Sequence, residues 1–150
     1  MNQFIYRLAR PEDLSDLMQA SVGNDGVTLD ADLLPQLVEN SKVYCAVSVD
    51  EIIALTYWQE DFLLRKDIWF LSQVTTKPFW RKKSVAFGLL KSFFDYAHGF
   101  GVKKIYFDIH PDNQPSLNLF KKIGAIESGS INGFDDEVLE DSRVIFRVNV

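Results

Sequence analysis

The sequence predicts a single mixed α/β domain whose elements follow the order β-α-α-β-β-β-α-β-α-β-β. Stretches rich in β-branched and aromatic residues, typical of strands, alternate with stretches whose apolar residues recur every three or four positions, typical of helices. With 150 residues and 47% hydrophobic content, the chain is long and apolar enough for one core without disulfide bonds or metal. Residues 1–150 contain no repeat, low-complexity tract or interdomain linker, so one domain is expected.

The first part of the chain predicts a strand followed by two helices. The stretch Phe4–Ala9 alternates as an opening strand does. Pro11 suits the first position of a helix, and the two acidic residues after it suit the positive end of that helix. Gly23–Gly26 is expected to form a loop. A second helix is expected from about Asp30, where Pro35 is tolerated only within the first turn.

Three strands are expected next. Residues 42–49 and 52–59 have strand composition, and the acidic pair between them predicts a hairpin. Residues 60–67 form a charged connection. Residues 68–76 are β-branched, aromatic and free of charge, which indicates a buried strand at the centre of the sheet.

The longest helix follows this central strand. Its apolar residues fall at helical spacing, at Ala86, Leu89, Leu90, Phe93, Phe94 and Ala97. His98 is expected in the last turn, and Gly99 is expected to provide the left-handed cap after it.

Three cations stand where this strand becomes the helix: Arg81, Lys82 and Lys83. A helix N-terminus attracts anions through its unpaired amides and its dipole, and nearby cations strengthen that attraction. The triplet therefore indicates either an anion site or an ordinary solvated run of charge.

The last third predicts a strand, a helix and two more strands. Residues 103–109 place Ile105, Phe107 and Ile109 on one face of a strand. After a turn at residues 110–113, a helix begins near Pro115 and ends at Gly124. The two final strands, which flank an acidic loop, are expected at about 125–130 and 143–150.

Two segments carry a family resemblance. The stretch Pro78–Leu90, with the pattern P-x-x-R-x-x-S-x-A, resembles motif A of the GNAT superfamily of N-acetyltransferases. The stretch Asn113–Ala125 resembles motif B of the same superfamily. Two motifs in the right order are more specific than either alone. The resemblance implies a central mixed, mostly antiparallel sheet of six or seven strands, with a splayed cleft for the cofactor.

The resemblance also implies acetyl-CoA as cosubstrate. The pantetheine arm would bind in the cleft as an added strand does, against backbone groups of Val74, Thr75 and Thr76. The pyrophosphate would rest on amides of the following loop and helix start, with charge from Arg81; these positions are Lys82, Lys83, Ser84, Val85 and Ala86. Asn113 would touch the cofactor arm, although a plain helix cap explains this residue equally well.

The sequence departs from the family pattern at two positions. Ser84 stands where the phosphate loop has its first glycine, and a Cβ there narrows the approach of phosphate to backbone. Phe120, the last of the implied cofactor contacts, stands where many members have a tyrosine whose hydroxyl protonates the departing CoA thiolate. His110 and Ser116 are the substitute catalytic candidates, and Tyr106 lies in the strand before them.

The acceptor is less defined. An alkyl ammonium has a pKa of about 10.4, so attack on a thioester needs a base or a desolvating pocket, and Glu60 or Asp61 would act through water. Acidic residues crowd the loop before the last strand, at Asp135, Asp136, Glu137, Glu140 and Asp141. Either they draw a cationic acceptor or they form a solvated loop.

Other functional classes lack support. Two histidines and the single Cys45 give no metal-ligand spacing, and a net charge of -5 does not suit nucleic acid. The absence of a signal peptide or a membrane-length apolar run predicts a cytoplasmic protein without a membrane partner. The sequence favours transfer of acetyl from acetyl-CoA to a primary amine. The alternative is a degenerate fold that binds CoA or a protein, and a homodimer stays open.

Overall fold

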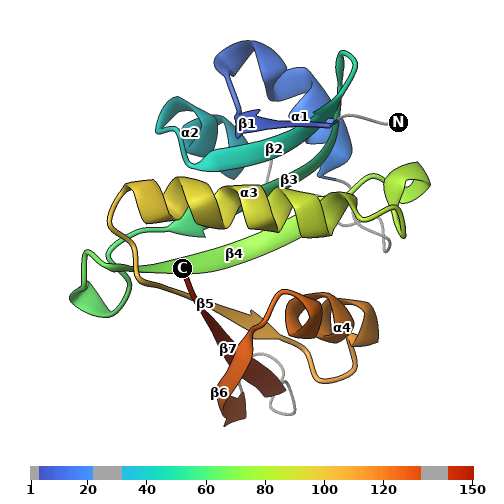
Figure 1. Ribbon diagram of the computed structural model, residues 1–150. Helices are drawn as coiled ribbons and strands as arrows, with labels where there is room; N and C mark the ends of the chain where they lie inside the picture. Colours follow the sequence, from blue (N-terminus) through green and yellow to red (C-terminus); the bar gives the residue numbers. More distant parts are fainter. Residues whose placement is uncertain (1–3, 22–31, 133–141) are drawn as a thin grey trace.

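The computed structural model describes residues 4–21, 32–132 and 142–150. Within these residues, seven strands form one sheet in the order β1-β2-β3-β4-β5-β7-β6 (Figure 1). Every neighbouring pair is antiparallel except β4 with β5, which is parallel. The strands are β1 Ile5–Leu8, β2 Val43–Ser48, β3 Glu51–Gln59, β4 Ile68–Thr76, β5 Lys104–Ile109, β6 Ile126–Asn132 and β7 Ser142–Asn149. The expected mixed, mostly antiparallel sheet is confirmed.

Helices cover both faces of the sheet. On one face α3 (Val85–Gly99) and α4 (Gln114–Lys122) share one core cluster with the strands; Phe93 of α3 stacks near Trp58 and Trp69. On the other face α1 (Leu14–Ala20) and α2 (Leu33–Glu39) bury apolar side chains against β2 and β3. No helix in the described ranges is long and apolar enough to cross a membrane.

The order of elements matches the prediction. β4 begins and ends at the predicted residues, and β2 and β3 form the predicted hairpin. Pro35 is the third residue of α2, within its first turn. The loop expected at Gly23–Gly26 and the helix start expected near Asp30 lie outside the described residues. Short 3-10 helices lie before α1, in the connection to β4 and after β4; they are η1 Pro11–Asp13, η2 Phe62–Leu64 and η3 Pro78–Trp80.

The predicted cap of the long helix is wrong by two residues. Gly99 is the last residue of α3, and Gly101 instead takes the left-handed conformation, with φ +82°. The Gly101 N–H donates to the His98 carbonyl at 2.9 Å, and the Val102 N–H donates to the Ala97 carbonyl at 3.3 Å, the pair of bonds of a Schellman motif. Val102 and Ala97 are both buried. The helix therefore ends where Val102 can enter the core.

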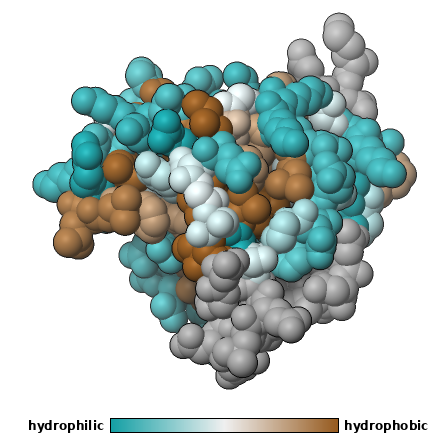
Figure 2. Space-filling view, turned by 90° about the horizontal axis from the view of Figure 1, so that it is seen from below, coloured by the Kyte–Doolittle hydropathy of each residue, from teal (hydrophilic) through white to brown (hydrophobic). Residues whose placement is uncertain are grey.

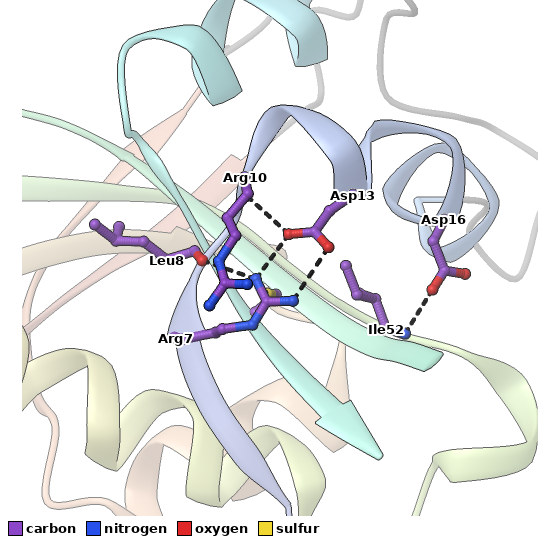
Figure 3. A network of polar contacts seen from close by, with 7 residues as sticks. Arg7, Leu8, Arg10, Asp13, Asp16 and Ile52 are labelled. Atoms are coloured by element: carbon purple, nitrogen blue, oxygen red, sulfur yellow. Dashed lines mark hydrogen bonds and ion pairs between the residues drawn. The ribbon is translucent and has the colours of Figure 1, made fainter. Parts of the chain in front are cut away.

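A polar network fixes the start of α1 against the sheet (Figure 3). Asp13 receives two hydrogen bonds from Arg7, at 2.7 and 3.1 Å, and a third from the Arg10 N–H at 2.8 Å. Asp16 accepts from the Ile52 N–H of β3 at 2.8 Å. The bonds from Arg7 are the main cause that lowers the pKa of Asp13 below its ordinary value. This bidentate pair ties η1 to β1.

We expect Asp13→Asn to lower the free energy of unfolding at pH 7 by about 2 kcal/mol, because it leaves part of the Arg7 fork unpaired in a half-buried place. Because folding lowers the pKa of Asp13, its contribution is fully present above its ordinary value of 3.8. The contribution is lost as the pH falls through the lower pKa of the folded state. Urea unfolding of both proteins at pH 7 and near pH 2 should therefore give a smaller difference in acid. Exposed Glu12→Gln is the control; an equal difference at both pH values would contradict the assignment.

Cys45 is a core residue of β2. Its side chain is fully buried, and burial raises the pKa of the thiol to about 12. A thiol in this state is no nucleophile at neutral pH, so Cys45 serves as an unpaired core side chain.

Candidate functional site

A gap opens in the middle of the sheet, between β4 and β5. Only Ile68–Phe70 of β4 pair with β5, at Lys104–Tyr106. Beyond that row the two parallel strands separate, and β5 stays paired along its length with β7. Residues 71–76 of β4 therefore have an open edge on the side of β5. The predicted splay is confirmed, and its apex lies at Phe70 and Tyr106.

The open edge presents particular backbone groups. Successive residues of an antiparallel strand direct their N–H and C=O to opposite sides. The Lys77 N–H donates to the Ile53 carbonyl of β3 at 2.8 Å, so the backbone of Thr75 also points to β3. The backbone groups of Val74 and Thr76 point to the gap. Of the three predicted pantetheine contacts, Val74 and Thr76 are in position, while Thr75 is directed at β3.

The loop after β4 brings unpaired amides to the open end of the gap. The first hydrogen bond of α3 runs from the Gly88 N–H to the Ser84 carbonyl at 3.1 Å, which leaves the N–H groups of Val85 and Ala86 for an external acceptor. Both Lys82 and Ser84 have left-handed backbones, with φ 59° and 63°. Residues without glycine's freedom are strained there, and this explains why a glycine would suit position 84.

The cations of this loop have different settings. The Arg81 Nε donates to the Thr76 carbonyl at 3.1 Å, so its side chain folds back over the end of β4. The Lys83 ammonium lies 5.0 Å from the centre of the Phe79 ring. Lys82 is exposed. All three stand between the end of β4 and the start of α3, as predicted, and Arg81 also braces the loop.

For the acetyl-CoA site that the resemblance implies, we expect Ser84→Gly to tighten binding by about three- to tenfold, because it removes a Cβ from the loop whose amides would face the diphosphate. Relief of the left-handed strain of about 1–2 kcal/mol is largely offset by the greater freedom of glycine in the unfolded chain, so the free energy of unfolding changes little. Calorimetric titration measures the affinity. Ser84→Ala, which keeps the Cβ and loses the hydroxyl, is the matched control. Equal affinity in the glycine and alanine variants would contradict this role of the Cβ.

The motif B residues are held by α4. The Asn113 side-chain oxygen accepts from the Ser116 N–H at 3.3 Å, so Asn113 is the helix cap that the sequence left open as its alternative role. Ser116 lies in the first turn. Phe120 is buried and stacks on Phe107, with ring centres 3.9 Å apart. Phe107 comes directly after Tyr106, the last residue of β5 that pairs with β4. Phe120 therefore lies beside the apex of the gap.

The other catalytic candidates are engaged elsewhere. The His110 Nδ1 accepts from the Asp112 N–H at 3.2 Å in the turn after β5, at the open end of the gap and away from its apex. Glu60 pairs with Lys42 and accepts from the Trp58 indole N–H at 3.3 Å. Asp61 begins the β3–β4 connection in a left-handed conformation. The five acidic residues from Asp135 to Asp141 lie outside the described residues.

Two buried polar atoms, one on β4 at the edge of the gap and one on β7 across β5 from it, were not singled out by the sequence. The Ser72 Oγ of β4 and the Arg147 Nε of β7 are both buried without a hydrogen-bond partner. The alternation of residues 143–148 predicts a strand face, but it does not reveal which strand lies beside it. No group of three His, Cys, Asp or Glu suited to a metal lies within the described ranges.

Two surface hollows of the described chain include no residue of the edges of β4 and β5 that border the gap. One is lined by Arg7, Leu8, Ala9, Arg10, Pro11, Val38, Glu39 and Ser41. The other is lined by Gln19, Glu51, Lys77, Pro78, Phe79 and Trp80. A ligand of the gap would be held by strand edges, as an added strand is.

Comparisons with known proteins agree with this geometry. The family model described as the acetyltransferase (GNAT) family matches residues 4–125. A GNAT-family acetyltransferase from Bacillus cereus is 18% identical, with a TM-score of 0.84 over 98% of this chain and 97% of its own. The ribosomal-protein-S18-alanine N-acetyltransferase of Escherichia coli is 11% identical, with a TM-score of 0.82 over 99% and 94%. At these identities the structures show a shared fold. No curated protein matches in sequence.

Proposed function

This chain belongs to the acetyltransferase (GNAT) family, and from that premise we propose that it transfers an acetyl group from acetyl-CoA directly to a primary amine. One observation carries the proposal: the open edge of β4 leads straight to the loop where unpaired amides and three cations meet. An extended arm with a diphosphate at one end fits this order of features. The diphosphate would lie at the start of α3, and the thioester would lie toward the apex.

The transfer is a single exchange at the thioester carbon. The nitrogen lone pair of the neutral amine attacks the carbonyl carbon, a C–N bond forms, and the C–S bond breaks. The nitrogen gives up one proton, and the CoA thiolate leaves and takes up one. Because an alkyl ammonium has a pKa of about 10.4, the amine has to lose a proton before it attacks.

Several residues would serve the cosubstrate. Backbone groups of Val74 and Thr76 would bind the arm, and the amides of Val85 and Ala86 would bind the diphosphate with charge from Arg81. Phe120 has no hydroxyl to protonate the thiolate. For a thiol with a pKa of about 8.5, departure as the thiolate at neutral pH costs only about 2 kcal/mol. The transfer therefore proceeds, but slowly, without a general acid. His110 and Ser116 stay candidates, and His110→Ala with an unchanged rate would remove His110.

Calorimetric titration with acetyl-CoA and, separately, with CoA tests the proposal. We expect micromolar binding of both, followed by formation of free thiol when primary amines are added. Binding without thiol release on any amine would favour the degenerate fold, which Ser84 and Phe120 would explain. No binding at millimolar ligand would contradict the assignment of the loop and the gap.

A further inference from the structure

One face of the sheet at the gap carries polar side chains. Ile105, Phe107 and Ile109 of β5 lie in the core beneath α3 and α4, so Tyr106 and Asp108 project from the opposite face. Among the described residues, the helices on that opposite face are α1 and α2, which pack on β2 and β3. We take the part of the face formed by β4, β5 and β7, which the cluster of α1 and α2 does not include, as the acceptor side of the gap.

Arg147 lies on this face at the level of the apex. Its register partner in β5 is Tyr106, and the register partner of Tyr106 in β4 is Phe70. The three residues thus form a row across three strands, at the last level where β4 and β5 are paired. Ser72, whose buried Oγ has no hydrogen-bond partner, follows Phe70 two residues further along β4 on the same edge of the gap.

The Arg147 Nε is the second buried atom without a hydrogen-bond partner. A guanidinium N–H that is shielded from water and left unpaired is unfavourable, and such a group marks a place for an external acceptor. Four residues before it in β7, Arg143 approaches Asp108 of β5 at 3.8 Å, so that arginine has a carboxylate of the chain beside it. In the described part of the chain, Arg147 forms no such ion pair.

Apolar side chains flank this row. Phe62 of the β3–β4 connection stacks on Phe70 and Tyr106, with ring centres 4.8 and 5.9 Å apart. The next residues, Leu63 and Leu64, are 62% and 99% exposed. Figure 2 shows apolar side chains in brown at its left edge, the side on which Figure 1 draws this connection. Phe62 therefore covers Phe70 and Tyr106, the two members of the row beside Arg147, with apolar surface.

We propose that Arg147 binds a carboxylate of the acceptor, so that the substrate is an amine that also carries a carboxylate group. The planar guanidinium presents Nε and one Nη side by side, which matches the two oxygens of a carboxylate. The inference rests on the proposed function, and it differs from a cationic acceptor drawn by the acidic loop.

Matched pairs of acceptors test this substrate class. The pairs are glycine, β-alanine, 4-aminobutyrate, L-phenylalanine and L-lysine, each against its own carboxamide, with 2-aminoethyl phosphate as the phosphate probe. Thiol release with acetyl-CoA gives kcat/KM, and titration of each amine in the presence of CoA gives its affinity. We expect at least one carboxylate to exceed its amide by tenfold or more in kcat/KM or in affinity.

The variants tie this preference to Arg147. Arg147→Met should remove the preference for the carboxylate by raising its KM or Kd about tenfold. The KM and Kd of the carboxamide and the affinity for acetyl-CoA should stay unchanged. Arg147→Lys keeps the charge but loses the paired N–H donors of the guanidinium, so it should keep part of the preference for the carboxylate. It replaces Arg147→Met in the test if that variant does not fold. Exposed Arg10→Met is the matched control.

The outcomes separate the two claims. Three outcomes overturn the carboxylate site while acetyl transfer stands. They are a preference for the carboxamides, a preference for 2-aminoethyl phosphate alone, and an equal loss of kcat/KM or affinity for both members of a pair in Arg147→Met. Binding of a carboxylate that depends on Arg147, without thiol release from any amine, overturns acetyl transfer while the site stands. No binding and no thiol release with any probe overturns both.

Discussion

Phe120→Tyr should accelerate acetyl transfer by about ten- to a hundredfold at pH 7. The phenol would lie beside the apex of the gap, where Phe120 now stacks on Phe107, and it would protonate the departing CoA thiolate. At neutral pH the thiolate of a thiol with a pKa of about 8.5 leaves at a disadvantage of about 2 kcal/mol, which sets the size of the gain. The gain should shrink above about pH 8.5, where the thiolate leaves unaided.

The pH profile separates this effect from a change of packing. Steady-state rates from pH 6 to 9, with one amine and saturating acetyl-CoA, should converge for the two proteins at high pH. Phe146→Tyr is the matched control, because Phe146 also stacks on Phe107, with ring centres 5.8 Å apart, but comes from β7. A folded Phe120→Tyr protein with the parent rate at every pH would show that position 120 does not reach the leaving group.

Arg81→Glu should weaken acetyl-CoA binding by roughly thirtyfold or more. Reversal of one charge beside a diphosphate at a protein surface is worth about 2 kcal/mol or more. The substitution also removes the bond from the Arg81 Nε to the Thr76 carbonyl, which braces the loop over the end of β4. Calorimetric titration at low and high salt is the measurement, and the difference between the two proteins should narrow as salt screens the diphosphate.

Two further variants divide the effect. Arg81→Gln removes the charge without reversing it, so it should fall between the parent and Arg81→Glu. Arg65→Glu changes an exposed arginine that pairs with Asp67 on the β3–β4 connection, and its affinity should stay within about twofold of the parent. An Arg81→Glu protein that binds acetyl-CoA as the parent does would remove Arg81 from the diphosphate site.

Local chemistry made most of the fold predictable. The uncharged, β-branched stretch at residues 68–76 and the apolar stripe of α3 fit one kind of element each, so their positions followed from pattern. The spacing from Pro78 to Leu90 placed the cations between strand and helix, where the structure has them. The left-handed cap lies at Gly101 and not at Gly99, because the helix ends where Val102 can be buried in the core. The positions of the glycines in the sequence do not reveal that burial.

The parts of the site that escaped prediction depend on pairing between distant strands. Thr75 points to β3 because of the register between β3 and β4, which includes a bulge next to Tyr57. Arg147 stands beside Tyr106 because the last strand inserts between β5 and β6, and no local pattern encodes that choice of neighbours. The remaining cofactor residues stay predictions, since their roles depend on a ligand.

The short contact between β4 and β5 divides the sheet into two panels. One panel, β1 to β4, carries α3, and the other, β5 to β7, carries α4; three residue pairs and a common core join them. The strand boundary with the fewest residue pairs therefore runs through the proposed reactive centre. A cosubstrate bound along that boundary would take the place of a strand and connect the two panels by its contacts to both. We expect slower hydrogen exchange at the backbone amides of β4 and β5 when the cosubstrate binds. The sheet would then be most rigid while the protein holds the acetyl donor.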